Sequence, residues 1–107
     1  MRRIALALSI LAASAASAAA LTPGDLSPQE QQLYATFKAN PTSAQNFLIT
    51  RDYVHQAQAT VSNPSNAASF PDKPAGFSVR YLLPGDKDII NQAVSLSVAA
   101  MAKTLWA

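Results

Sequence analysis

Apolar side chains recur every three or four residues in three stretches of the chain, and this spacing predicts three helices. The first helix is expected over residues 28–39, with Leu33, Tyr34 and Phe37 on one face. The second is expected over residues 43–61, where the stripe consists of Phe47, Thr50, Val54, Ala57 and Val61. The third is expected over residues 87–105 and is the most apolar, with a continuous stripe of Ile90, Val94, Val98, Met101 and Leu105.

Polar residues and prolines indicate where these helices begin and end. The run Ser-Pro-Gln-Glu predicts a capping box, in which Ser27 accepts from the amide of Glu30 and Glu30 accepts from the amide of Ser27. The pair Asn40-Pro41 is expected to end the first helix, because the residue before a proline is disfavoured in helical conformation. Thr42 is then the expected cap of the second helix.

Two segments before the third helix lack helical spacing. Residues 62–76 contain three prolines and several Ser and Asn residues, which is typical of an extended surface loop, and Phe70 is expected to hold it to the core. Residues 77–83 alternate in polarity and predict a short extended strand, which would pair with another chain or with the loop, or else form an irregular connection. Asp86 or Asp88 is expected to start the third helix. The predicted fold class is therefore mainly α, a small three-helix domain with a proline-rich loop and one short extended segment.

The amino-terminal residues have the three-part composition of a secretory signal peptide. Two arginines precede an apolar run over residues 4–11, and small residues follow as far as Ala20. The apolar run is short compared with the roughly 20 residues that a membrane anchor needs. We therefore expect cleavage of residues 1–20, to within two residues, which leaves one small helical domain over residues 21–107. This domain is expected to be periplasmic or secreted, without a stable membrane span.

Charge and cysteine content exclude several classes of function. The full chain carries a formal charge of +2, but two of its eight basic residues lie in the predicted signal peptide, so residues 21–107 have six basic and six acidic residues. The six bases are scattered, whereas nucleic-acid binding uses clustered Lys and Arg, and no nucleic-acid partner is expected. The chain has no cysteine, which excludes disulfides, thiol catalysis and thiolate metal sites.

Candidate catalytic and metal-binding residues are few. His55 is the single histidine, and Asp52 lies three residues before it on the predicted second helix, so a small hydrolase that uses His55 is one alternative. No Gly-x-Ser-x-Gly motif accompanies the pair. Asp86 and Asp88 lack the further oxygen ligands of a calcium loop, and no metal or cofactor is expected. Arg51 and Asp52 are expected to lie exposed on the polar side of the second helix.

The absence of a catalytic motif favours a non-enzymatic binding or accessory protein, which acts on an unknown protein partner or by self-association. The candidate interaction surface is the stripe of the third helix, formed by Ile90, Val94, Val98, Met101 and Leu105, unless this stripe is the centre of the core. The main alternative is a carrier of a small apolar ligand held between the helices.

Overall fold

The computed structural model describes residues 21–106 and the side chains of residues 21–103. The predicted signal peptide therefore lies outside the described residues. Three α-helices form the frame: α2 (Pro28–Phe37), α3 (Pro41–Ser62) and α4 (Asp86–Trp106). Short 3-10 helices connect them: η2 (Pro23–Asp25), η3 (Pro64–Ser69) and η4 (Val79–Tyr81). The described part of the chain is mainly helical and contains no strand, so the coarse prediction of a mainly α protein is confirmed.

The start of α2 follows the predicted capping box. The amide of Ser27 donates to Glu30 Oε1 at 2.9 Å, and the amide of Glu30 donates to Ser27 Oγ at 3.1 Å. The cap prediction for α3 is wrong by two residues, because Asn40 is the N-cap and its Oδ1 accepts from the amide of Ser43 at 3.0 Å. Pro41 opens α3, since a proline in the first turn loses no intrahelical hydrogen bond.

Residues 77–83 form no strand, and of the alternatives considered for this segment the irregular connection is the one that the structure shows. The middle of this segment is η4, in which Ser78 Oγ caps the turn by accepting from the amide of Arg80 at 3.3 Å. Tyr81 is buried, whereas Val79 is exposed, so the alternating apolar residues do not share one covered face. Within the described residues no extended segment lies beside this one to form a ladder, and local turn hydrogen bonds are made instead.

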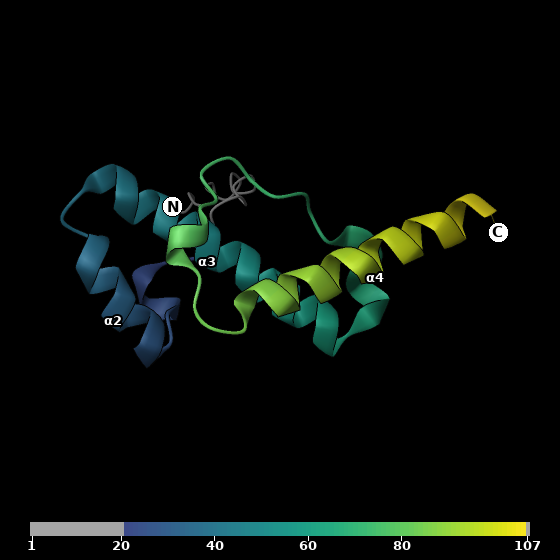
Figure 1. Ribbon diagram of the computed structural model, residues 1–107, viewed down its shortest axis with the longest axis horizontal. Coiled ribbons are helices and arrows are strands. Elements are labelled where there is room, and N and C mark those ends of the chain that lie inside the picture. Colours follow the sequence, from purple (N-terminus) through teal and green to yellow (C-terminus); the bar gives the residue numbers. More distant parts are fainter. Residues whose placement is uncertain (1–20, 107) are drawn as a thin grey trace, which may run out of the picture.

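The helix α3 runs through the middle of the molecule, and the other elements pack along it (Figure 1). Its first half belongs to an aromatic cluster with the buried residues Leu26, Phe47 and Tyr81, against which α2 packs. Its second half joins α4 and the loop in another cluster, whose buried members are Tyr53, Val54, Ala57, Ile90 and Ala93. As predicted, Phe70 holds the loop to the core, with its ring centroid 5.1 Å from that of Tyr53.

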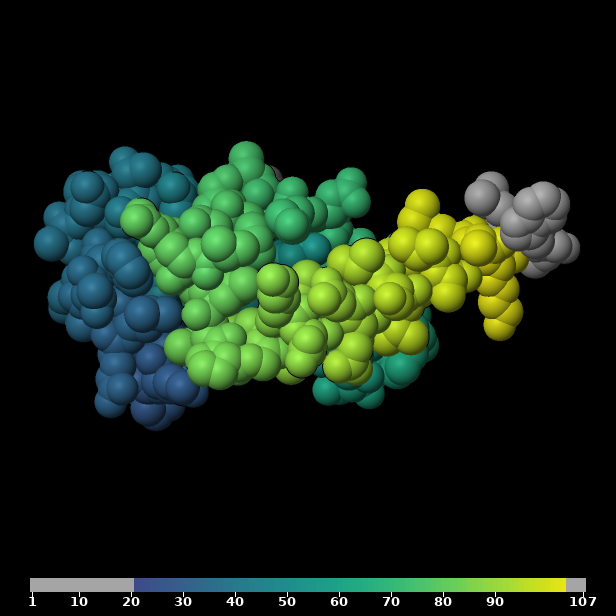
Figure 2. Space-filling view, in the orientation of Figure 1, coloured from purple at the N-terminus to yellow at the C-terminus, as the bar shows by residue number. Residues whose placement is uncertain are grey.

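The apolar stripe of α4 is divided between two environments. Ile90 is buried in the core, whereas Val94, Val98 and Met101 have 41%, 60% and 57% of their surface exposed. The side chain of Leu105 lies outside the described residues. Figures 1 and 2 show the carboxyl-terminal turns of α4 extending beyond the rest of the molecule. We call the three exposed residues Val94, Val98 and Met101 the outer face of α4.

Across residues 21–106, no helix is both long enough and apolar enough to cross a bilayer.

Candidate functional site

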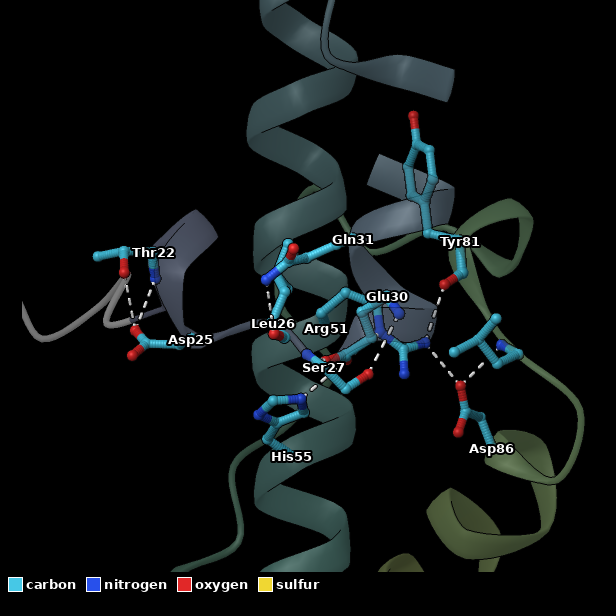
Figure 3. A network of polar contacts seen from close by, with 11 residues as sticks. Thr22, Asp25, Leu26, Ser27, Glu30, Gln31, Arg51, His55, Tyr81 and Asp86 are labelled. Atoms are coloured by element: carbon cyan, nitrogen blue, oxygen red, sulfur yellow. Dashed lines mark hydrogen bonds and ion pairs between the residues drawn. The ribbon is translucent and has the colours of Figure 1, made fainter. Parts of the chain in front are cut away.

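Arg51 is the centre of the polar site, in contrast to the exposed position expected from the sequence. It is only 2% exposed, although its neighbour Asp52 is partly exposed. Its Nε donates to Glu30 Oε2 at 2.7 Å, and its Nη1 donates to Asp86 Oδ2 at 2.6 Å and to the carbonyl of Tyr81 at 2.9 Å (Figure 3). One guanidinium group thus joins α2, α3, η4 and the start of α4.

Glu30 has two roles, in the cap of α2 and in this site. Its Oε1 accepts from the amide of Ser27, while its Oε2 accepts from Arg51 Nε and lies 2.8 Å from His55 Nε2. Burial by itself would raise the pKa of this carboxyl group. The hydrogen bonds from Ser27, Arg51 and His55 outweigh burial, and the pKa of Glu30 lies below its usual value. The carboxylate is therefore ionised under ordinary conditions.

Asp86 is positioned by a tight turn at the beginning of α4. Gly85 has a φ of +91°, which residues with a side chain rarely adopt, so the turn depends on glycine here. The turn brings Asp86 Oδ2 to 2.7 Å from the amide of Leu83, which donates to it, and to 2.6 Å from Arg51 Nη1. Asp86 lies in the first turn of α4, as predicted, and its carboxylate is also the second buried acid of the site.

His55 contacts Glu30, and its expected partner Asp52 points elsewhere. The side chain of His55 is 34% exposed, and the Nε2 nitrogen must carry the proton to donate to the Glu30 carboxylate. Asp52 instead accepts from the side-chain amide of Gln56 at 2.8 Å. The arrangement of Asp52, His55 and a serine that a hydrolase would need is thus not assembled. Ser27, the serine that lines the site, uses its hydroxyl oxygen to cap α2.

These side chains line an open pocket of about 490 Å³. Arg51, Glu30, His55 and Asp86 line it together with residues of the η2–α2 connection, and Leu83 and Ile89 add apolar surface. With five ionisable side chains in its wall, since Asp25 also lines it, this pocket does not suit the apolar ligand that the carrier alternative requires.

The described residues form no metal site, since nowhere do three His, Cys, Asp or Glu side chains gather in a suitable arrangement. Comparisons with known proteins give no further guide to chemistry: no protein-family model matches the chain, and neither does any curated protein or solved structure.

Sequence reasoning missed the site because its parts are far apart in the chain. Glu30 and Arg51 are separated by 21 positions, and Arg51 and Asp86 by 35. One signal was nonetheless present in the second helix. Arg51 lies three residues before Val54, and residues at that spacing share a helix face, so the apolar stripe already placed Arg51 beside buried positions.

Proposed function

We propose that this protein is exported and acts outside the cytoplasm as a non-enzymatic binding or accessory protein, with the outer face of α4 as its contact surface. The observation that supports this is the exposure of Val94, Val98 and Met101 on a helix that extends past the body of the molecule. Large apolar side chains gathered on a projecting element are typical of an interaction site.

The proposed partner is another protein with an apolar groove that receives α4. Residues 89–102 carry no charge, so a groove could enclose this part of the helix without burying an ion. A flat contact between two copies is less favourable, because three partly exposed side chains supply only a small part of the ~800 Å² that each partner buries in a standard interface. A groove would also cover Ala99 and Ala102, which are exposed beside the outer face.

Photo-cross-linking in the native host tests this proposal. A photo-reactive phenylalanine analogue is placed at position 98, and in a matched variant at position 92, which is exposed on the opposite side of α4. We expect one defined adduct with another protein from position 98 and none from position 92. The partner identified in this way should bind the purified chain, and Met101→Asp should weaken that binding while Gln92→Asp leaves it unchanged.

Three results would contradict the proposal. Equal cross-linking from positions 92 and 98 would mean that the outer face has no special role. An adduct with the mass of two copies would replace the partner by self-association. Binding that is insensitive to Met101→Asp would place the contact elsewhere on the molecule.

Export is tested separately by amino-terminal sequencing of the protein from the extracytoplasmic fraction. The expected sequence begins at Ala19 or Leu21. Recovery of intact Met1 in a membrane fraction would replace cleavage by anchoring.

A further inference from the structure

One nitrogen of the Arg51 guanidinium group has no partner among residues 21–106. Nε and Nη1 make the three hydrogen bonds described above, whereas Nη2 makes no hydrogen bond with the described residues. Arg51 is 2% exposed and lines the pocket, and Figure 3 shows Nη2 pointing between His55 and Asp86. Buried donors are rarely left unpaired, because an unpaired donor loses its hydrogen bonds to water without replacement.

Asp86 has an unpaired acceptor beside this donor. Its Oδ2 accepts from Arg51 Nη1 and from the amide of Leu83, whereas Oδ1 receives no hydrogen bond from the described residues. Asp86 is also buried and lines the pocket. Since Arg51 and Asp86 are in direct contact, the free donor and the free acceptor belong to the same part of the wall.

The charges around the pocket restrict what can bind there. The buried carboxylates of Glu30 and Asp86 exceed the single guanidinium charge of Arg51, and exposed Asp25 adds a further negative charge at the rim. A simple anion is therefore repelled by the acids, and a simple cation leaves Nη2 unpaired. A ligand that carries both charges matches the wall at both points.

We propose that this pocket binds a small zwitterion of the α-amino-acid class. The ligand carboxylate accepts from Arg51 Nη2, and the ligand ammonium group donates to Asp86 Oδ1. The pocket, with a volume of about 490 Å³, is large enough for a small amino acid, and the side chain of this ligand would contact Leu83 and Ile89. This inference goes beyond the function proposed for α4 and does not depend on it.

Titration of the purified protein with glycine, followed by NMR, tests the proposal. Glycine should shift the backbone amides of Ser27 and Gly85, which line the pocket, in a saturable manner, with no shift at Ala44, which does not line it. Acetate and methylammonium carry one charge each and should bind at least about tenfold more weakly. Acetamide has both hydrogen-bonding groups without charge. If it bound as tightly as glycine, the site would not require a zwitterion, and the proposal would be overturned.

Two variants connect the binding to these residues. In Asp86→Asn the side-chain oxygen can still accept the hydrogen bonds that the fold uses, but the negative charge that pairs with the ligand ammonium group is removed. The affinity for glycine should therefore fall about tenfold, and acetate should be repelled less. Gln58→Trp fills the rim of the pocket from an exposed position on α3, and it should abolish the shifts. Gln45→Trp is the matched control, because Gln45 is exposed on α3 but does not line the pocket.

Besides tight binding of acetamide, either of two outcomes overturns the proposal. One is the absence of saturable shifts with glycine, alanine and serine, which would mean that the free donor and acceptor bind water alone. The other is unchanged glycine binding in Gln58→Trp. If Asp86→Asn does not fold, Gln58→Trp decides, since its exposed side chain makes no hydrogen bond with the described residues.

Discussion

The centre of this molecule buries charged side chains, whereas the end of α4 exposes apolar ones. Arg51, Glu30 and Asp86 are almost inaccessible, while more than half of the surface of Val98 and Met101 is exposed. Residue type alone would predict exposed charged side chains and buried apolar ones. Burial here depends on tertiary partners. The charged residues contact each other where the helices converge, whereas the end of α4 extends past the elements that could cover it (Figure 1).

The buried charges are tolerated because they are paired. Each of the two carboxylates contacts the same guanidinium group and also a backbone amide. Removing one member of such a group leaves the others buried without compensation. The outer face of α4 is the opposite case, since its side chains are largely exposed.

The largest effect is expected for Arg51→Ala. The change leaves two buried carboxylates uncompensated, which typically costs about 3–5 kcal/mol, and a small domain has roughly 5–15 kcal/mol of stability. We expect a protein that is largely unfolded or close to unfolding at 25 °C, as measured by circular dichroism during urea denaturation. Arg80→Ala is the control, because exposed Arg80 makes only cation–π contacts with its side chain, 6.0 Å from the centroid of Phe37 and 5.8 Å from that of Tyr81, and the change should cost about 1 kcal/mol or less. Equal effects would remove the distinction between buried and exposed arginines.

Adjacent positions on α4 should then respond very differently to the same change. Ala93 is fully buried and Val94 is 41% exposed. Ala93→Asp introduces a buried charge without a partner and should cost several kcal/mol, whereas Val94→Asp should change stability by less than about 1 kcal/mol. Thermal and urea unfolding of both variants measure the difference. Unfolding by Val94→Asp would mean that the outer face is covered in the native protein.

A moderate effect is expected on acidification, through Glu30. Because the pKa of Glu30 is lowered in the folded protein, its contribution to stability is fully present above the usual value of 4.5 and is lost as the pH falls through the lower folded value. Between about pH 6 and about pH 3, the wild type should lose more stability than Glu30→Gln, which cannot titrate at this position. Exposed Asp25 also has a lowered pKa, through its contacts with Thr22, but it is present in both proteins and cancels in the comparison. Parallel stability curves for the two proteins would contradict this assignment.

The smallest effect is expected for His55→Ala. The change removes one hydrogen bond to Glu30 from a side chain that is 34% exposed, and such bonds contribute about 1 kcal/mol. Gln58→Ala, on the same helix and exposed, should be nearly neutral. Urea denaturation distinguishes the two variants. A loss above about 3 kcal/mol in His55→Ala would place this residue among the essential members of the cluster.

Local features of the fold could be predicted from the sequence, because their causes are local. The capping box of Ser27 and Glu30 lies within four residues, and the helical stripes follow from chain periodicity. The sequence does not fix the cap of α3, because Asn40 and Thr42 are both good caps, and the position of Pro41 in the first turn decides between them.

Features that depend on distant partners could not be predicted. The alternation in residues 77–83 is compatible with a strand, but a strand needs a neighbour, and Phe77 and Tyr81 instead join separate clusters. Arg51 and Asp86 come together only once α3 and α4 are packed. The apolar stripe of α4 likewise has the same apolar character along its whole length in the sequence. Only the packed structure shows which of its residues other elements cover.

Hydrogen–deuterium exchange along α4 in the purified protein tests this comparison most directly. Amides of residues 90–97 should be protected to nearly the free energy of global unfolding, because Ile90 and Ala93 pack one face of this part of α4 into the core. Amides of residues 101–103, where every side chain is exposed, should exchange about 100-fold faster or more. The end of α3 provides the control, since buried Thr60 lies there and protection should persist. Uniform protection from residue 90 to residue 103 would contradict the account, because it would mean that the outer face is already covered in the isolated protein.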